Sequence, residues 1–476
     1  MSFVDKDLES IQEARILMES ARDSHYMLKE YDQGIIDKII GLMIPKIREN
    51  AQVLIDANIS ETQYGKAEDE LKLLYQVLDN MESSVLSQKC IGVLEQNTQG
   101  DITEVGVPLG VIVTLLPAEN SVTNTIFTAL LSLKSGNTCV FVPHKRGANS
   151  TRKAISFIKN LAEVSGLPKN CLSSMQHVSN EGVAEITNHS ATALIINIGQ
   201  KKCKGASNVL HRPMIYGGTG STPVFIEKTA NIKQACFDII RSRSFNNGIL
   251  PGAEQYLIVE GIIANQVKEE LINQGAHFMT QEEERLLLDL IKPCGTFVCS
   301  EVIGKSACYL AEKAGFAVRS DVKVLVSEQD YIFDENPYSD EMKFPILTFY
   351  LEPDWLHACE KCINLLKAKQ NGHSLVIHSH NQKVTNEFAL KKPVGRVLVN
   401  GPATFNSLGL ESTLPFTFVL GGLTMGQGIT AKNITAKDLT YVRQIGYPIE
   451  KTKSVQTDFN MSEDELVRIL KKIINQ

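Results

Sequence analysis

The spacing of apolar residues predicts the elements of the first hundred residues. From about residue 5 to residue 79, apolar side chains recur at intervals of three and four, which is typical of amphipathic helices. The pattern changes to short alternating stretches over residues 88–107, around a turn signal at Gly100 and Asp101. This alternation predicts a β-hairpin or an extended arm.

A β-α-β unit is expected directly after this arm. Residues 110–116 form a nearly continuous apolar run that ends at Pro117, as expected for a strand buried on both faces. A helix is predicted over 123–133, followed by a second buried strand over 138–142 that stops at Pro143.

The same alternation of strands and helices continues, and it predicts an α/β protein with parallel sheets covered by helices. The first half is Rossmann-like. We expect a cofactor domain over 1–234 with the arm at 88–107, a second α/β catalytic domain over 235–445, and a C-terminal arm and tail over 446–476. Further strands are expected at 193–198, 224–226, 256–259, 322–326, 346–350, 375–377 and 397–399.

The tail carries a capping-box pattern over residues 462–465, which predicts a short helix. One face of that helix would be apolar, and so short a segment needs a surface on which to bury this face. The surface belongs either to the same subunit or to a partner that receives the helix in a groove. The apolar positions are Leu466, Ile469, Leu470 and Ile473.

Composition excludes several classes of protein. A net charge of −6 gives no sign of the basic excess that nucleic-acid binding requires. No apolar run approaches the length of a membrane span, and the acidic, amphipathic start does not resemble a secretory signal. Ten cysteines are scattered without a compact framework, as in a reducing compartment. We therefore expect a cytoplasmic protein without nucleic-acid or membrane partners.

Nine short motifs occur in order along the chain. They are 107–112 (VPLGVI), 116–120 (LPAEN), 133–137 (LKSGN), 141–144 (FVPH), 217–224 (GGTGSTPV), 244–248 (SFNNG), 254–255 (EQ), 372–373 (GH) and 395–400 (GRVLVN). Each motif is weak alone, but their order and spacing are specific. Over residues 35–449 the chain resembles the aldehyde dehydrogenase superfamily, and specifically its CoA-acylating branch. That branch includes the enzymes of ethanolamine and propanediol pathways and the aldehyde half of bifunctional alcohol dehydrogenases.

The resemblance implies oxidation of a small aldehyde to acyl-CoA, with NAD or NADP as hydride acceptor and coenzyme A as co-substrate. It implies that Asn120 donates to the oxyanion, that His373 assists proton or CoA transfer, and that Glu341 contacts the nicotinamide ribose. Relatives form homodimers or homotetramers through a β-arm, and those in bacterial microcompartments use short amphipathic helices for encapsulation. The implied cofactor-binding residues are Leu116, Pro117, Ala118, Pro143, His144, Gly199, Gly217, Gly218 and Gly220, together with Glu341.

The chain departs from the family where the nucleophilic cysteine should stand. The family motif aligns without a gap to residues 245–255, and the cysteine position is Pro251. Proline has no thiol, and it lacks the backbone N–H that would join Asn120 in holding the oxyanion. Losing the nucleophile costs on the order of 10⁶ in turnover, and losing an oxyanion donor about 10² to 10³.

Other thiols offer weak alternatives. Cys236 is the cysteine nearest to Pro251 in sequence, but it lacks the matching context. The pair Cys359 and Cys362 has metal-like spacing without a second pair, so a buried helix face is expected there and no metal site is assigned. Glu227, which follows a strand, receives no role as a general base.

Two functions from different classes follow. By resemblance, the protein is an NAD(P)-dependent, CoA-acylating aldehyde dehydrogenase, impaired in thioester chemistry by Pro251. The alternative is a non-catalytic ligand-binding or structural partner of an active paralogue. A third reading is non-covalent hydride transfer from an aldehyde hydrate.

Overall fold

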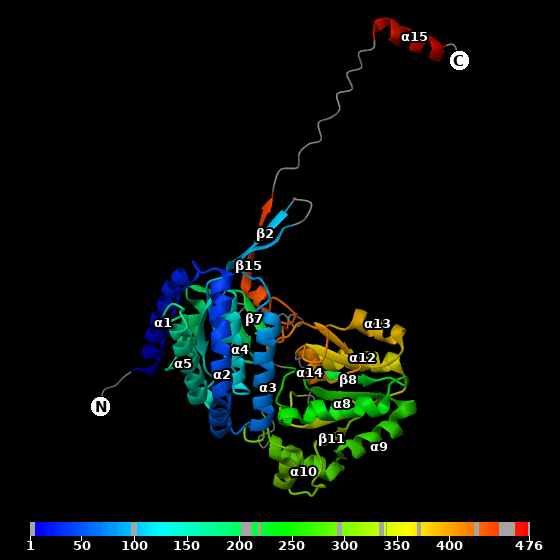
Figure 1. Ribbon diagram of the computed structural model, residues 1–476. Helices are drawn as coiled ribbons and strands as arrows, with labels where there is room; N and C mark the ends of the chain where they lie inside the picture. Colours follow the sequence, from blue (N-terminus) through cyan, green and yellow to red (C-terminus); the bar gives the residue numbers. More distant parts are fainter. Residues whose placement is uncertain are drawn as a thin grey trace.

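Two parallel sheets with helices on both faces, and a third antiparallel sheet, make up the computed structural model (Figure 1). It describes residues 5–96, 102–200, 212–217, 220–292, 298–332, 338, 340–368, 373–422, 428–446 and 462–474. The predicted α/β class with parallel sheets is confirmed. In the described residues, no helix combines the length and the apolar character needed to cross a membrane.

The first sheet has five parallel strands in the order β5-β4-β3-β6-β7. Its centre, β3, is buried at every position, as the apolar run predicts. Strands β5 and β7 were not predicted, because both are short. The strands are β3 (Val111–Leu115), β4 (Thr138–Val142), β5 (Leu172–Ser174), β6 (Thr192–Ile198) and β7 (Met214–Gly217).

Helices cover this sheet on both faces. One face packs against α2, α4 and α5, and the other against α1 and α6, so the sheet separates two apolar clusters. The helices are α1 (Lys6–Leu28), α2 (Gln33–Thr62), α3 (Ala67–Asn80), α4 (Ser121–Lys134), α5 (Ala148–Val164) and α6 (Asn180–Asn188).

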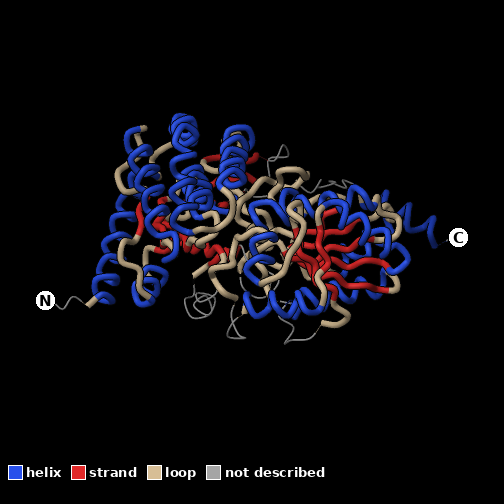
Figure 2. Tube along the Cα trace, turned by 90° about the horizontal axis from the view of Figure 1, so that it is seen from below, coloured by secondary structure: helices blue, strands red, loops and turns tan. Residues whose placement is uncertain are grey.

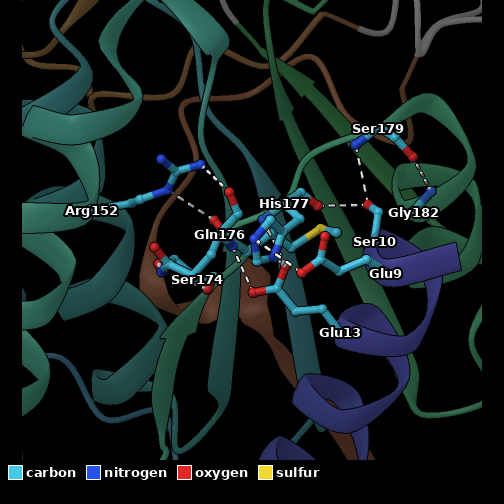
Figure 3. A network of polar contacts seen from close by, with 10 residues as sticks. Glu9, Ser10, Glu13, Arg152, Ser174, Gln176, His177, Ser179 and Gly182 are labelled. Atoms are coloured by element: carbon cyan, nitrogen blue, oxygen red, sulfur yellow. Dashed lines mark hydrogen bonds and ion pairs between the residues drawn. The ribbon is translucent and has the colours of Figure 1, made fainter. Parts of the chain in front are cut away.

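Polar contacts attach α1 to the segment after β5 (Figure 3). The Glu13 carboxylate accepts from the backbone N–H groups of Gln176 and His177, both at 2.7 Å. The Ser10 hydroxyl donates to the His177 carbonyl at 2.6 Å and accepts from the Ser179 N–H at 3.2 Å. These bonds fix the first helix against one edge of the sheet.

The second sheet has seven parallel strands in the order β10-β11-β12-β9-β8-β13-β14. Figure 2 shows its strands in red, between helices in blue. Helices α8, α9 and α14 pack on one face, and α12 and α13 on the other. The strands are β8 (Thr222–Ile226), β9 (Glu254–Glu260), β10 (Ala276–Phe278), β11 (Val324–Glu328), β12 (Ile346–Glu352), β13 (Ser374–His378) and β14 (Arg396–Val399). The helices are α8 (Ile232–Ser244), α9 (Ala264–Gln274), α10 (Gln281–Ile291), α11 (Ala307–Ala314), α12 (Trp355–Ala368), α13 (Gln382–Lys391) and α14 (Ala403–Ser407).

Two parts of the expected domain division are wrong. Strand β8, which we placed in the first domain, pairs with β9 and β13 in the second sheet. The chain also returns after α14, because Phe416, Phe418 and Ile434 belong to the apolar cluster of the first sheet. Hydrophobic patterning could not show this return, since it identifies buried residues without identifying the core that they join.

The arm is a hairpin of β1 (Gly92–Gln96) and β2 (Ile102–Pro108), as predicted, although the turn at Gly100 and Asp101 lies outside the described residues. A third strand, β15 (Thr440–Gly446), was not predicted and pairs antiparallel with β2. Figure 1 shows this sheet projecting from the body.

The predicted tail helix is present as α15 (Glu463–Ile474), and Figure 1 shows it apart from both sheets. Its apolar stripe is exposed, from 46% at Leu466 to 67% at Ile473. The stripe is therefore not buried on the described part of its own chain.

Candidate active site

Seven of the expected cofactor-binding residues lie at one edge of the first sheet. Residues 116–118 follow β3, and Pro143 and His144 follow β4. Gly199 follows β6, and Gly217 ends β7. The carboxyl ends of parallel strands meet at the same edge, where ligands of open α/β sheets bind. Gly218 lies outside the described residues.

A narrow cavity of about 30 Å³ lies beside this edge, between the two sheets. It brings together Pro117, Asn120, Gly199 and Pro251, which were all expected at the site. Of the other expected residues that the structure describes, Leu116, Ala118, Pro143 and His144 do not line it. Gly217, Gly220, Glu341 and His373 do not line it either. The lining residues are Pro117, Glu119, Asn120, Asn124, Ile198, Gly199, Ile249, Leu250, Pro251, Lys343, Leu408 and Phe418.

Asn120 is held in a fixed orientation at the start of α4. Its backbone is left-handed, with φ 46°, and its side chain is buried. The amide oxygen accepts from the Asn246 side chain at 2.7 Å, which leaves the amino group as the donor for a ligand. Asn246 accepts in turn from the Lys66 N–H at 2.6 Å. The Asn120 amino group is therefore positioned as a hydrogen-bond donor at the cavity.

Pro251 lies in the turn between the 3₁₀ segment Phe245–Gly248 and β9. It lines the same cavity as Asn120. The turn is tightly seated, because a Cβ on Gly252 would lie 2.3 Å from the Ser407 hydroxyl. Neither a thiol nor a backbone N–H is present at residue 251.

His373 lies close to this turn but does not line the cavity. Its ring Nδ1 is 2.9 Å from the Ser374 hydroxyl, and the ring is buried. Burial, and then the charge of Arg396, lower the pKa of His373 to about 3, so the imidazole is neutral at neutral pH. A Cβ at Gly220 would lie 2.2 Å from His373 Nε2 and 2.7 Å from the Pro251 carbonyl oxygen. Only glycine fits at residue 220.

An ion pair that we did not predict occupies one wall of the cavity. Lys343 Nζ donates to Glu119 Oε1 at 2.8 Å, and the side chains are 24% and 14% exposed. Burial alone would raise the pKa of Glu119, but the charge and hydrogen bond of Lys343 outweigh it and lower that pKa. Burial opposes the charge of Lys343, yet Glu119 and Glu341 raise its pKa. Both groups are therefore charged at neutral pH.

Gln255 and Arg243 position the segment that carries Lys343. Gln255 Nε2 donates to the Asp340 carbonyl at 2.6 Å, and Gln255 Oε1 accepts from the Met342 N–H at 2.9 Å. Buried Arg243 donates to the carbonyls of Met342, Phe344 and Ile346 at 2.7, 2.8 and 2.9 Å. One guanidinium thus donates to three carbonyl groups of this segment. Lys343 is thus held from both sides.

The same segment places Glu341 against the glycine-rich loop. Glu341 Oε1 accepts from the Gly220 N–H at 3.2 Å. Gly217 faces the returning chain, because a Cβ there would lie 2.6 Å from Val419. It also forms an isolated antiparallel bridge with Gly421. Packing thus accounts for glycine at 217 independently of any ligand.

No cysteine of the described ranges lines the cavity. Cys236 lies in the apolar cluster under α8 and α9, and burial raises its pKa to about 12. Such a thiol does not form a thiolate at neutral pH. Cys359 and Cys362 lie in the cluster between α12 and the second sheet, as expected for a buried helix face.

Comparison with known proteins agrees with this fold. The profile described as "Aldehyde dehydrogenase family" matches residues 10–284. An acetylating aldehyde dehydrogenase from Geobacillus thermoglucosidasius is 31% identical, with a TM-score of 0.88 over 94% of this chain and 99% of that one. A probable aldehyde dehydrogenase from Listeria monocytogenes is 32% identical, with a TM-score of 0.90 over 95% of this chain and 100% of that one. The chain belongs to the aldehyde dehydrogenase family.

Some relatives among curated proteins are longer. The aldehyde-alcohol dehydrogenase of Streptococcus pneumoniae is 28% identical over 81% of this chain, and the match covers 45% of that protein. The chain therefore spans about half the length of this relative.

Proposed function

We propose that the chain is a CoA-acylating type of aldehyde dehydrogenase that retains binding of a small aldehyde and a dinucleotide, and has lost thioester formation. One observation carries this proposal. Pro251 lies in the cavity beside the preserved donor Asn120, where the family's reaction needs a thiol.

The remaining residues support binding of a carbonyl group. The Asn120 amino group would donate to the aldehyde oxygen. Without a thiolate, no covalent adduct forms at the carbonyl carbon, so no thioester can pass to coenzyme A. Neutral His373 cannot replace the nucleophile, because it lies outside the cavity lining.

The loops at the ends of β3, β4 and β6 fit a dinucleotide, bound as NAD or NADP. Gly199, with φ 73°, presents backbone without a side chain to the cavity. Pro143, His144 and Gly199 would hold the nucleotide, and Glu341 would face its ribose. When bound, the nicotinamide supplies a hydride acceptor.

A second candidate is a non-catalytic ligand-binding or structural partner of an active paralogue. The Lys343–Glu119 pair favours it, because these side chains fill cavity space beside Asn120. Glu119 also offers a carboxylate that could take a proton from an aldehyde hydrate, which keeps non-covalent hydride transfer as a weaker third reading.

Two measurements on the wild-type chain separate these functions. Calorimetry with NAD, NADP and coenzyme A measures binding, and absorbance of the reduced nicotinamide measures turnover with short aldehydes, with and without coenzyme A. The proposal expects dinucleotide binding with no acyl-CoA formation. Robust acyl-CoA formation would overturn it, whereas reduced nicotinamide formed without coenzyme A would favour the hydrate reaction. Absence of all binding would favour a structural partner.

We propose a homodimer or homotetramer assembled through the arm. Strands β1 and β15 are the edges of the arm's sheet, and exposed edges need partners. Sedimentation at micromolar concentration tests this, and a monodisperse monomer would contradict it. We further propose that α15 docks to a pathway or microcompartment protein in the cytoplasm.

A further inference from the structure

We propose that Cys359 and Lys392 form a redox modification site, in which one oxygen atom links the cysteine sulfur to the lysine nitrogen. Lys392 Nζ lies 2.6 Å from Cys359 Sγ. The other sulfur contacts are longer: Cys139 Sγ lies 3.3 Å from Thr114, and Cys308 Sγ lies 3.3 Å from the Val322 carbonyl oxygen. The Cys359 contact is therefore short for a hydrogen bond, and it is too long for a direct N–S bond.

The surroundings hold the two groups together. Cys359 is on α12 and Lys392 follows α13, and the side chains are buried in or beside the same apolar cluster. In the described residues, the hydrogen-bond acceptors of Lys392 Nζ are the carbonyl oxygen of Cys359, at 2.8 Å, and its sulfur. The ammonium also lies 4.2 Å from the centre of the Phe388 ring. No carboxylate of the described residues joins this set, so the Cys359 sulfur is the side-chain partner of the lysine nitrogen.

The reaction balances with dioxygen as the oxidant. A neutral amine, a thiol and one O₂ give the N–O–S link and one water. One oxygen atom forms single bonds with nitrogen and with sulfur, and the other leaves as water with the thiol proton and one amine proton. Four electrons pass from the two side chains to O₂. Two molecules of hydrogen peroxide give the same link and three waters, through a sulfenic acid at Cys359.

The link would connect the chain segments on either side of His373, which lies near the candidate active site. Cys359 precedes His373 and Lys392 follows it, so the link closes a loop that contains His373. Arg396, four residues after Lys392, donates to the His373 carbonyl at 3.0 Å. Closing this loop restricts the unfolded chain and should raise the thermal midpoint. This inference is independent of the proposed function.

Mass spectrometry of the full chain, exposed to air or dilute peroxide and then treated with dithiothreitol, tests the inference. The link adds about 14 Da and is lost on reduction. Cleavage at glutamates not followed by proline places Cys359 on peptide 342–360 and Lys392 on peptide 388–411, so a linked pair of these peptides identifies the site. Cys362 falls on a third peptide and is resolved from both.

Four variants complete the test. Cys359→Ser and Lys392→Arg should abolish the 14 Da product and the midpoint rise, because one removes the sulfur and the other the primary amine. The matched controls Cys362→Ser and Lys391→Arg should retain both. Three results would each overturn the proposal. They are an unchanged mass under oxidation, a loss of about 2 Da from a disulfide to Cys362, and a gain of about 32 Da from a sulfinic acid on Cys359 alone. Circular dichroism confirms that each variant is folded.

Discussion

Removing one partner of the Lys343–Glu119 pair should destabilise the protein strongly. Lys343→Met leaves the carboxylate of Glu119, which is 14% exposed, without its cation. Breaking a buried pair in this way costs about 3–5 kcal/mol. Because Lys343 is 24% exposed, water screens part of the interaction, and we expect about 2–3 kcal/mol.

The double variant Glu119→Gln, Lys343→Met separates pairing from packing. It removes both charges with little change of volume, so it should recover most of the lost stability. Urea unfolding of the wild type, both single variants and the double variant gives the coupling energy. A loss below about 0.5 kcal/mol for Lys343→Met would refute our account of the pair as buried and charged.

The pair also predicts a pH dependence. The pKa of Glu119 is lowered in the folded protein. Its contribution is therefore present above its unfolded pKa, and it is lost as the pH falls through the lower, folded pKa. The difference in unfolding free energy between wild type and Glu119→Gln should shrink on acidification. A difference that is constant from neutral to acid pH would contradict the assignment.

Three further predictions concern His373, Gly220 and the tail. The folded pKa of His373 is lowered from 6.5 to about 3, so between these pH values the unfolded chain binds one more proton than the folded chain, and the free energy of unfolding should rise with pH. In urea unfolding, His373→Asn should flatten this rise. An unchanged slope would contradict the prediction. Gly220→Ala should lower the melting temperature by several degrees, because its Cβ would meet the His373 ring and the Pro251 carbonyl; an unchanged value would show that the loop relaxes. Deleting the residues after Asp458 should leave the melting temperature unchanged and remove co-purifying pathway or shell proteins, since the α15 stripe is exposed. A large loss of stability would indicate that the helix packs within the subunit. If neither the melting temperature nor the co-purifying proteins change, docking is contradicted.

Much of the fold follows from local pattern. Strands such as β3 and β4 are continuous apolar runs closed by proline, so their burial can be read directly. Strand β10 has three residues, too few for a periodic signal. Strand β15 is exposed along most of its length and pairs with β2, which lies more than 300 residues earlier. Its pairing depends on the tertiary fold.

The candidate site shows the same limit. Family motifs identify Asn120 and Pro251, and the structure brings both to one cavity. Lys343 and Glu119 are 224 positions apart, and nothing local indicates that they pair. A lysine within the otherwise apolar segment 342–347 was the available signal, because a charged residue in a buried segment requires a partner.

If Pro251 is what prevents thioester chemistry, the Pro251→Cys variant should form acyl-CoA. The substitution restores a thiol and a backbone N–H beside Asn120, and Lys343 in the same cavity favours the thiolate. Acyl-CoA formation from short aldehydes, measured for the variant beside the wild type and a Pro251→Ser control, should rise at least about 10²-fold in the cysteine variant alone. Equal turnover of wild type and Pro251→Cys, at a rate typical of active enzymes, would contradict the account.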